Sequence, residues 1–427
     1  MRMLLVTLLL VGSLTRSAMS LDNGLALTPA MGYNSWYDVT CSGDMNEKII
    51  MASADAMVST GLAKLGYKYI NLDDCWAKGR DSTGAVYADN ATFPSGMKAL
   101  ADYVHSKGLL FGVYTDRGTN TCGGRPGSQD HETIDAKSYA SWGVDYVKED
   151  SCHAPNTHGS GYAQYGKMRD ALNATGRPIY FSLCGWNEWY APVGYSLGNS
   201  WRISRDDTNW GGIITNINVN AKLAPYAGPG GWNDPCLLLG NTSANKPRIT
   251  DLQQRSQFSM WAVMASPLLI SSNIRKLSTY ALETYSNEEV IAVNQDKIGR
   301  QGLRLAGGDL SGEGVKQSTQ TDEIPKHLHK RTFDHLPSEL PAQQNIWGRQ
   351  LLDGGWALVF LNNGKDDVDM TCDAACFAPT GFDASTSFTV RDLWLHKDIG
   401  TGTGSNYTVS KVPANGGSVM LKLSFLP

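Results

Sequence analysis

The chain has 427 residues, which is long enough for one large enzyme-sized domain and a smaller one. Apolar residues make up 41% of it and charged residues 18%, the ordinary composition of a globular protein. A formal net charge of −4 offers a polyanion no long-range attraction, so we expect no nucleic-acid partner. The 12 Trp and 18 Tyr suit neutral, ring-shaped ligands, although aromatic residues more often belong to the core.

The first 20 residues are arranged like a secretory signal peptide. Arg2 precedes an apolar run at 3–12, and the small-residue stretch Ser-Ala-Met-Ser at 17–20 can supply the cleavage site. The run is too short to span a bilayer and no later stretch is apolar for long enough, so we expect no membrane insertion. Eight cysteines, an even number, fit an oxidising compartment. We therefore expect a secreted, extracellular or lysosomal (vacuolar) protein with four glycosylation sequons, at Asn90, Asn173, Asn241 and Asn406.

Short β-rich runs alternate with amphipathic helical stretches between residues 31 and 274. The expected strands are Met31–Trp36, Tyr67–Asp73, Leu109–Asp116, Val144–Asp150, Ile179–Cys184, Trp201–Asp206, Gly230–Asp234 and Pro267–Ser272. The expected helices include Asn46–Thr60, Gly96–Lys107, Glu132–Trp142, Tyr162–Ala174 and Asp251–Ala265. This alternation predicts an α/β fold, a (β/α)8 TIM barrel. A doubly wound open sheet is the alternative, but its Gly-rich phosphate turn after the first strand is missing.

The composition changes after about residue 294. The stretch 307–341 is rich in Gly, Ser, Gln, Lys, Asp and Pro, which predicts an exposed insertion or linker. Beyond it, strand-like alternation occurs at Ile346–Leu351, Trp356–Leu361, Ser387–Leu393 and Gly417–Phe425. We expect a signal peptide at 1–20, the barrel at 21–300, and a small C-terminal antiparallel β-sandwich domain at 301–427.

Acidic residues gather at the carboxyl ends of the expected barrel strands. They are Asp73, Asp74, Asp116, Glu149, Asp150, Asp206, Asp207 and Asp234. In a (β/α)8 barrel these strand ends form the active face. Capping of the following helices would explain one or two of the acids, but not the whole set.

The chemistry these acids could perform is narrowed by the motifs that are missing. No histidine forms a HExxH pattern, and Cys372 and Cys376 lack a second pair of ligands, so we expect neither metal nor cofactor. No nucleophile elbow or phosphate loop is present. Carboxylates beside aromatic and basic residues fit glycoside hydrolysis, in which one attacks the anomeric carbon and another protonates the leaving oxygen. Aromatic residues next to strand ends that can stack on a sugar are Trp36, Trp76, Tyr114, Trp186 and Trp232.

Five segments carry a family resemblance: MGYNSW at 31–36, NLDDCW at 71–76, GVYTD at 112–116, VDYVKEDSC at 144–152 and GGWNDP at 230–235. Together and in this order they resemble the α-galactosidase (melibiase) family, glycoside hydrolase family 27. The resemblance runs from about residue 25 to 295 and more loosely beyond. It implies a retaining exo-glycosidase that releases terminal α-linked galactose from oligosaccharides or glycoconjugates.

The resemblance also implies residue roles. Asp150 matches the nucleophile, and Asp206, four residues after Arg202, matches the acid/base, with Asp207 as the alternative. Lys148 would hold sugar hydroxyls and favour ionised Asp150 by lowering its pKa. Two carboxyls about 5–5.5 Å apart would retain the anomeric configuration. The remaining expected substrate contacts are Asp73 and Asp74 at O4 and O6, Arg202 at the 2- and 3-hydroxyls, and Trp36, Tyr114, Trp186 and Trp232.

Two further acids are expected outside the catalytic set. Asp116 is more readily interpreted as a structural acid than as a catalyst. Glu149 alternates with Lys148 and Asp150 along its strand, so its side chain should point away from the barrel interior.

The family's pairings, placed on this chain, imply disulfides 41–75, 122–152 and 372–376. Cys184 and Cys236 remain, because the stretch before the sixth strand has no cysteine to pair with Cys184. Counting cysteines therefore predicts a fourth disulfide between Cys184 and Cys236, with two free thiols as the alternative.

Two positions depart from the family pattern. Cys236 stands where the family usually has Asp. Gly185 follows the strand-five cysteine, where a large polar residue favours the 2-hydroxyl of galactose and a small one leaves room for an acetamide. The bulky run from Trp186 to Tyr190 can fill that room, so galactose is favoured. The alternatives are an α-N-acetylgalactosaminidase, a transglycosylase, a β-L-arabinopyranosidase, or an inactive carbohydrate-binding protein; a homodimer is left open.

Overall fold

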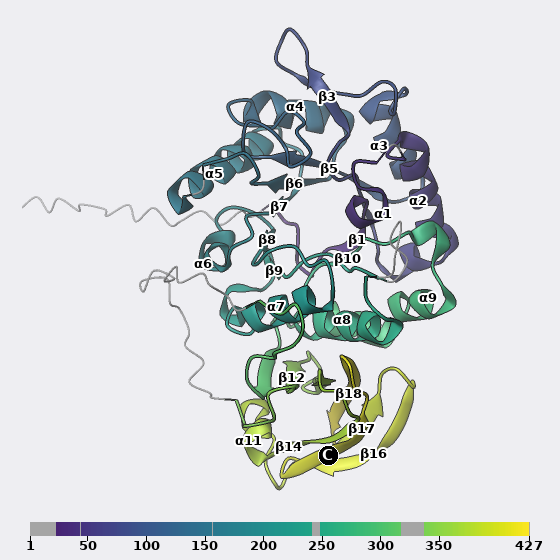
Figure 1. Cartoon of the computed structure of the whole chain (residues 1–427), viewed down its shortest axis with the longest axis vertical. Coiled ribbons are helices and arrows are strands. Elements are labelled where there is room, and N and C mark those ends of the chain that lie inside the picture. The colour runs from purple at the N-terminus through teal and green to yellow at the C-terminus, as the bar shows by residue number, and fades with distance from the viewer. Residues whose placement is uncertain (1–22, 43, 156, 241–247, 317–336, 427) are drawn as a thin grey trace, which may run out of the picture.

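The computed structural model describes residues 23–42, 44–155, 157–240, 248–316 and 337–426 (Figure 1). The predicted signal peptide, the sequon at Asn241 and most of the predicted insertion at 307–341 lie outside the described residues. Two eight-stranded sheets organise the described chain, the first parallel and the second antiparallel.

The parallel sheet is the predicted barrel, with strand order β10-β1-β2-β5-β6-β7-β8-β9. Its two ends meet just beyond β9, where the Leu238 amide donates to the Leu269 carbonyl at 2.9 Å and the Leu238 carbonyl accepts from the Ser271 amide at 2.9 Å. The (β/α)8 prediction is therefore confirmed. The strands are β1 Met31–Asn34, β2 Tyr69–Asn71, β5 Leu110–Asp116, β6 Tyr146–Asp150, β7 Tyr180–Leu183, β8 Ser200–Arg202, β9 Trp232–Asp234 and β10 Leu268–Ile270.

All five helices named from the sequence are present within a few residues of their predicted bounds: α2 Glu47–Ser59, α3 Gly96–Ser106, α4 Glu132–Trp142, α5 His158–Ala174 and α8 Asp251–Val263. A capping box at Thr250 and Gln253 begins α8. Elements that we did not name in advance are the helices α1 Trp36–Val39, α6 Ala191–Gly194, α7 Trp210–Asn220, α9 Thr279–Tyr285 and α10 Glu288–Asn294, and the hairpin β3 Ala77–Arg80 with β4 Val86–Ala88.

The second sheet forms the C-terminal β-sandwich, with strand order β11-β12-β13-β18-β15-β16-β17-β14. Four of its strands match the predicted runs: β12 Gln344–Gln350, β13 Trp356–Asn362, β15 Ser387–Asp392 and β18 Gly417–Phe425. The others are β11 Leu303–Ala306, β14 Val368–Asp373, β16 Lys397–Thr403 and β17 Asn406–Val412, with the short helix α11 Ala374–Phe377 after β14. Side chains of β16 are mostly exposed, so this strand lacks the apolar alternation that would have predicted it.

Helix α8 lies between the barrel and the C-terminal domain (Figure 1). Nine of its thirteen residues are buried, because one side packs on the barrel and the other on β13 and β18. Arg349 on β12 is fully buried at this junction and donates to the carbonyls of Val293, Asn294 (2.9 Å) and Ala262 (3.2 Å). Burial lowers the pKa of Arg349 to about 10. In the described part of the chain, no helix combines the length and apolarity needed to cross a bilayer.

Candidate active site

Strand β6 places Lys148 and Asp150 on the same side of the barrel, because alternate residues of a strand share a face. The Lys148 ammonium lies 2.9 Å from Asp73 Oδ2 and 3.8 Å from Asp150 Oδ2, so one cation bridges acids from the ends of β2 and β6, the strands on either side of β5. It also lies 5.0 Å from the centroid of the Tyr114 ring. These residues, predicted from separate motifs, come together at one point of the barrel mouth.

Asp73 and Asp74, which follow β2, are both buried and held by short contacts. Asp73 Oδ2 also accepts from Asn34 Nδ2 at 2.7 Å, while Asp74 Oδ2 accepts from the Gly123 amide at 2.6 Å. Burial raises the pKa of Asp74, partly offset by the hydrogen bond from Gly123. The pair is therefore rigid, with Asp73 tied to Lys148.

The pKa of Asp150 is raised to about 7, mainly because the carboxyl is buried. Lys148 lowers this pKa, as the sequence predicted, and the negative charges of Asp206, Asp116 and Asp73 raise it. Burial outweighs the lysine, so the net shift is upward. Asp150 and Asp206 thus lie within electrostatic reach of each other at the same mouth.

Arg202, the last residue of β8, connects two more acids. Its guanidinium pairs with Asp206 through Nη1 and with Asp234 through Nε, the latter at 3.2 Å from Oδ2. Arg202 is buried with 2% of its side chain exposed, whereas Asp206 exposes 36%. Asp206 lies four residues beyond the end of β8, on the connecting segment rather than on the strand we predicted for it. It is the acid of this group that reaches solvent.

Asp207, the alternative proton donor, is not accessible to solvent. It is fully buried, Gln257 Nε2 donates to its Oδ2 at 3.3 Å, and burial raises its pKa well above the usual range. A carboxyl in that position cannot reach a substrate, so the geometry favours Asp206.

The aromatic residues predicted at the strand ends divide into two groups. Tyr114 lies under Lys148, and Trp36 and Trp186 are half-buried at the mouth. Trp232 is fully buried, and its Nε1 donates to the Ala26 carbonyl at 2.8 Å. It is the first residue of β9 and so lies at the amino end of that strand. Trp232 as a substrate contact is therefore wrong.

Trp76 is also buried rather than displayed. Its Nε1 donates to the Tyr114 carbonyl at 2.9 Å, and its ring packs edge-on against Tyr139 and Trp142. It supports the Tyr114 strand from behind.

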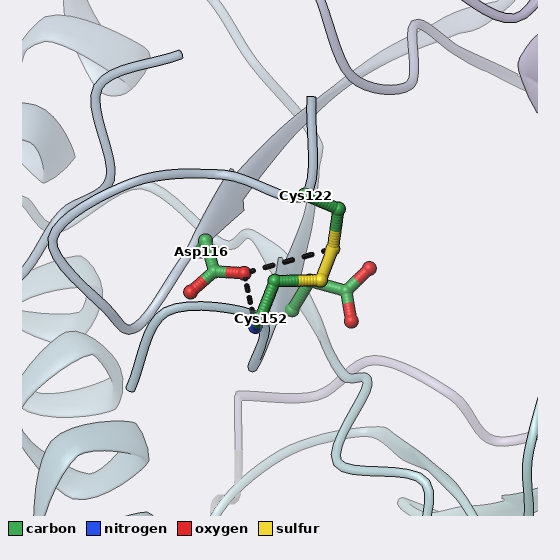
Figure 2. A group of neighbouring side chains, drawn as sticks. Asp116, Cys122 and Cys152 are labelled. Carbon is green, nitrogen blue, oxygen red and sulfur yellow. Dashed lines mark hydrogen bonds between the residues drawn. A yellow bond between two sulfur atoms is a disulfide. The ribbon is translucent and has the colours of Figure 1, made fainter. Parts of the chain in front are cut away.

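Figure 2 shows Asp116 beside the Cys122–Cys152 disulfide. Asp116 Oδ2 accepts from the Cys152 amide at 2.7 Å, and Oδ1 accepts from the Gly118 amide at 2.7 Å. These contacts fix the loop after β6, which agrees with the expected structural role of Asp116. The acids and sulfurs here lie close enough together to suggest a metal site, but the sulfurs are bonded to each other and cannot bind as thiolates.

The disulfides 41–75, 122–152 and 372–376 are all present as the resemblance implied. The remaining pairing, Cys184 with Cys236, is wrong: both are free buried thiols. Cys184 ends β7 near Asp150 and Arg202, while Cys236 Sγ lies 3.8 Å from Asp206 Oδ1. Burial raises the pKa of both thiols well above the usual value. Cys184 therefore lies near Asp150, and Cys236 lies near Asp206.

Glu149 is buried, with neither carboxylate oxygen hydrogen-bonded to any described residue. Burial raises its pKa well above the usual range, and the acids Asp116, Glu132 and Asp135 raise it further. Glu132 and Asp135 lie on α4, outside the barrel wall. Glu149 is thus on the helix side of β6, as the alternation of the strand predicted.

The space beside Gly185 is occupied by the ring of Tyr190. A Cβ placed on Gly185 would lie 2.1 Å from Cε2 of that ring. Tyr190 is buried and held edge-on against Tyr165 and Trp189. Gly185 therefore does not open a pocket, and the aromatic run after it closes the space, as one of our two alternatives proposed.

A cavity of about 600 Å³ opens directly from Asp206. Trp186 and Glu188 form one side and one face of α7 forms another, with Gly314 and Lys316 opposite. Sequence reasoning missed this cavity, because α7 had not been predicted and nothing placed residues 309–316 across it. The Asn209 cap, which accepts from the Gly212 amide, was the available signal for the start of α7.

Comparison with known proteins places the whole chain in one family. The family model described as alpha galactosidase A matches residues 28–296, and a model of the alpha galactosidase C-terminal beta sandwich domain matches residues 342–423. The chain is 44% identical to an alpha-galactosidase of Cyamopsis tetragonoloba over 381 residues, which are 88% of this chain and 82% of that protein.

Solved structures agree. The crystal structure of alpha-galactosidase I from Mortierella vinacea superposes with a TM-score of 0.80 at 32% identity, over 94% of this chain and 98% of that one. The alpha-galactosidase of Saccharomyces cerevisiae, solved with raffinose, gives a TM-score of 0.79 at 28% identity, over 95% and 99%.

Proposed function

Because the chain belongs to the α-galactosidase family of glycoside hydrolases, we propose that it hydrolyses terminal α-D-galactosyl residues at non-reducing ends, with retention of configuration. The observation that carries the proposal is the pairing of Lys148 with Asp150 at the mouth that also holds Asp206. A buried, ionisable nucleophile and a solvent-facing second acid are the two groups that double displacement requires.

In the proposed mechanism, Asp150 attacks the anomeric carbon and Asp206 gives its proton to the departing oxygen. The positive charge of Lys148 stabilises the negative charge of Asp150, so the carboxylate is ionised near neutral pH although it is buried. The glycosyl–enzyme ester is then opened by a water molecule that Asp206 deprotonates. The ion pair with Arg202 orients the Asp206 side chain for that step.

The sugar itself would be held by the rigid acids and aromatic residues around this pair. Asp73 and Asp74 accept hydrogen bonds from O4 and O6, Arg202 approaches the 2- and 3-hydroxyls, and Trp36 and Tyr114 cover the ring. The Lys148–Asp73 contact, at 2.9 Å, couples galactose recognition to the nucleophile. A transglycosylase would use the same groups, and a β-L-arabinopyranosidase would leave Asp74 without the 6-hydroxyl.

Galactose is preferred to N-acetylgalactosamine because Tyr190 fills the space beside Gly185. An acetamide there would have to displace a buried ring that packs on two other aromatic residues. We expect hydrolysis of an aryl α-galactoside and little of the matching α-N-acetylgalactosaminide. The reverse preference would contradict this substrate assignment.

We also propose that residues 1–20 are removed as a signal peptide, and that the catalytic barrel (21–300) and the C-terminal domain (301–427) enter the secretory pathway together. Three of the four sequon asparagines, Asn90, Asn173 and Asn406, are exposed and available for glycosylation. Mass spectrometry of protein from a eukaryotic host would identify the first residue and the modified asparagines.

The decisive test is the variant Asp150→Asn, which keeps the shape of the side chain and removes the nucleophile. We expect kcat for an aryl α-galactoside to fall by about 10⁴-fold or more. In the truncated variant Asp150→Gly, which leaves space for it, a small external nucleophile such as azide should restore turnover. The matched control is Glu149→Gln, the same change one residue away on the other face of β6, which should keep its activity.

A second measurement separates an enzyme from an inactive carbohydrate-binding protein. A mechanism-based galactose analogue should label Asp150 in the wild-type protein, as detected by peptide mass spectrometry. A protein that binds galactose but is not labelled, or an Asp150→Asn variant that keeps its activity, would refute the mechanism.

A further inference from the structure

Asp234 is a buried acid of the barrel mouth that has no part in the mechanism above. It ends β9 and is paired in register with Arg202, the last residue of the neighbouring parallel strand β8. Its Oδ2 accepts a hydrogen bond from Arg202 Nε at 3.2 Å. Burial lowers the pKa of the Arg202 guanidinium, and Asp234 has the largest effect among the charges that raise this pKa above its usual range. Asp234 is therefore the main counter-charge of Arg202.

The other oxygen of Asp234 fixes the chain at Cys236. Asp234 Oδ1 accepts from the Cys236 amide at 2.9 Å, and Trp261 Nε1 donates to the Cys236 carbonyl at 2.8 Å. Cys236 has a φ of 123°, a backbone conformation that residues other than glycine rarely adopt. The two hydrogen bonds hold the backbone in this conformation, and the Cys236 thiol then lies 3.8 Å from Asp206 Oδ1.

Arg202 and Cys236 reach the same oxygen of Asp206. Arg202 Nη1 donates to Asp206 Oδ1, and the Cys236 thiol is the second donor to that atom. Burial raises the pKa of the thiol well above its usual value, so the thiol keeps the proton that it donates. No described residue donates a hydrogen bond to Asp206 Oδ2, although the side chain is 36% exposed. The two oxygens of Asp206 therefore differ, because the protein holds only one of them.

The same contacts set the orientation of the Arg202 guanidinium. Asp234 holds its Nε and Asp206 holds its Nη1, while no described residue accepts a hydrogen bond from Nη2. A guanidinium is planar, so fixing two of its nitrogens also fixes the direction of the third. Nη2 is then the group that can reach a sugar hydroxyl, as the proposed function requires.

We propose that Asp234 is a positioning residue for proton transfer. It holds Arg202 and Cys236 so that both bind Oδ1 of Asp206, and Oδ2 is therefore the oxygen that carries the proton. In the first step this proton passes from Oδ2 to the leaving oxygen as the bond from that oxygen to the anomeric carbon breaks and the ester to Asp150 forms. In the second step Oδ2 takes a proton from the water whose oxygen replaces Asp150 on the anomeric carbon.

The inference rests on the proposed function, in which Asp206 is both the acid and the base. Asp234 acts through Arg202 and Cys236 and does not touch the reacting atoms. Its contribution is that the proton-carrying oxygen already has one orientation when the substrate arrives, so no rearrangement is needed during proton transfer.

The test is Asp234→Asn, assayed on a galactosyl saccharide and on an aryl α-galactoside with an acidic phenol. The amide keeps the shape of the side chain but has only one acceptor oxygen, so either Arg202 Nε or the Cys236 amide loses its partner. We expect the loss of kcat/KM to be about tenfold or more larger on the saccharide, because only its leaving oxygen needs the proton. Changes in galactose binding affect both substrates and cancel in this ratio.

The matched control is Asp116→Asn. Asp116 is also a buried carboxyl at a strand end, and it also accepts two hydrogen bonds, from the amides of Gly118 and Cys152. It has no hydrogen bond to Asp206 or Arg202, so any loss of kcat/KM in this variant should be equal on the two substrates.

A second variant, Cys236→Ala, removes the thiol and keeps the backbone amide that Asp234 binds. Because a thiol is a weak donor, the loss on the saccharide should exceed the loss on the aryl galactoside by only about threefold. Equal losses on both substrates in folded Asp234→Asn would refute the proposal, and Cys236→Ala decides in the same way if Asp234→Asn does not fold. Failure of the wild-type protein to hydrolyse the aryl galactoside would instead overturn the proposed function.

Discussion

Asp150 and Glu149 are neighbours on β6, but their buried carboxyls lie on opposite faces of the strand and have different charged neighbours. On the barrel side, Asp150 lies 3.8 Å from the Lys148 ammonium, and its pKa is about 7. On the helix side, Glu149 has no hydrogen-bonding partner among the described residues, and burial, together with the neighbouring acids, raises its pKa well above the usual range although Arg117 lowers it. Burial therefore favours the protonated form of both carboxyls, and at Asp150 the nearby ammonium of Lys148 opposes it.

The first way to sharpen this comparison is Asp206→Asn, from which we expect the largest effect. Removing the proton donor should lower kcat/KM by about 10²–10⁴-fold on a saccharide substrate. The loss should be much smaller on an aryl galactoside with an acidic phenol, because that oxygen departs without a proton. Equal losses on the two substrates would mean that Asp206 is not the acid.

The second is Lys148→Met, which removes the ammonium group beside Asp150. Asp73 and Asp150 would remain buried without their cation, at a cost of about 3–5 kcal/mol in the free energy of unfolding. The pKa of Asp150 would rise, so the acid limb of the kcat/KM–pH profile should move above its wild-type midpoint near pH 7. Urea unfolding and a pH–rate profile measure the two effects, and an unmoved acid limb would contradict the role of Lys148.

The third is Glu149→Gln, which removes the ionisable group from the helix side. The folded-state pKa of Glu149 is raised, so the protein loses stability as the pH rises above the unfolded value near 4.5. The variant avoids this loss and should be more stable by about 1–3 kcal/mol at pH 7, with little advantage near pH 4. Urea unfolding at both pH values measures it. The same advantage at both would indicate a packing effect instead.

The smallest effect concerns the thiols on the barrel side. Because burial raises the pKa of Cys184 and Cys236, neither should react with a thiol reagent in the native protein. Two thiols should appear on denaturation without reductant. Rapid native labelling with loss of activity would show that the barrel mouth opens more than the structure indicates.

Much of the site was predictable because it follows from strand periodicity and strand ends. Lys148 and Asp150 had to share a face, Glu149 had to lie on the other, and parallel strands had to bring Asp73 to the same edge. The family resemblance implied the role of Asp206 through its spacing from Arg202, although Asp206 lies past the strand. In the C-terminal sheet, β16 lacks the apolar alternation that predicts a strand, and β11 has only four residues.

What the sequence did not predict depends on packing between distant segments. The sequence predicts that Trp232 lies near a strand end. In the structure it is the first residue of β9, so it lies at the amino end of the strand and contacts Ala26. The even number of cysteines allowed Cys184 and Cys236 to form a disulfide, but both thiols are free in the structure. A count of cysteines contains no information on the distance between them. The cavity beside Asp206 is closed by the segment 309–316, which crosses a helix about 100 positions earlier in the chain, as Lys316 does at Thr215.

The buried Arg349 at α8 has a consequence for how the protein unfolds. Its guanidinium accounts for hydrogen bonds to the carbonyls that end α10, and nine of the thirteen residues of α8 are buried between the barrel and the β-sandwich. Separating the two halves would break these hydrogen bonds and expose the side of α8 that packs on β13 and β18 at the same time. Calorimetry should therefore record a single unfolding transition for the two domains. A chain truncated near residue 300 should precipitate, because the barrel alone should not fold into a soluble domain.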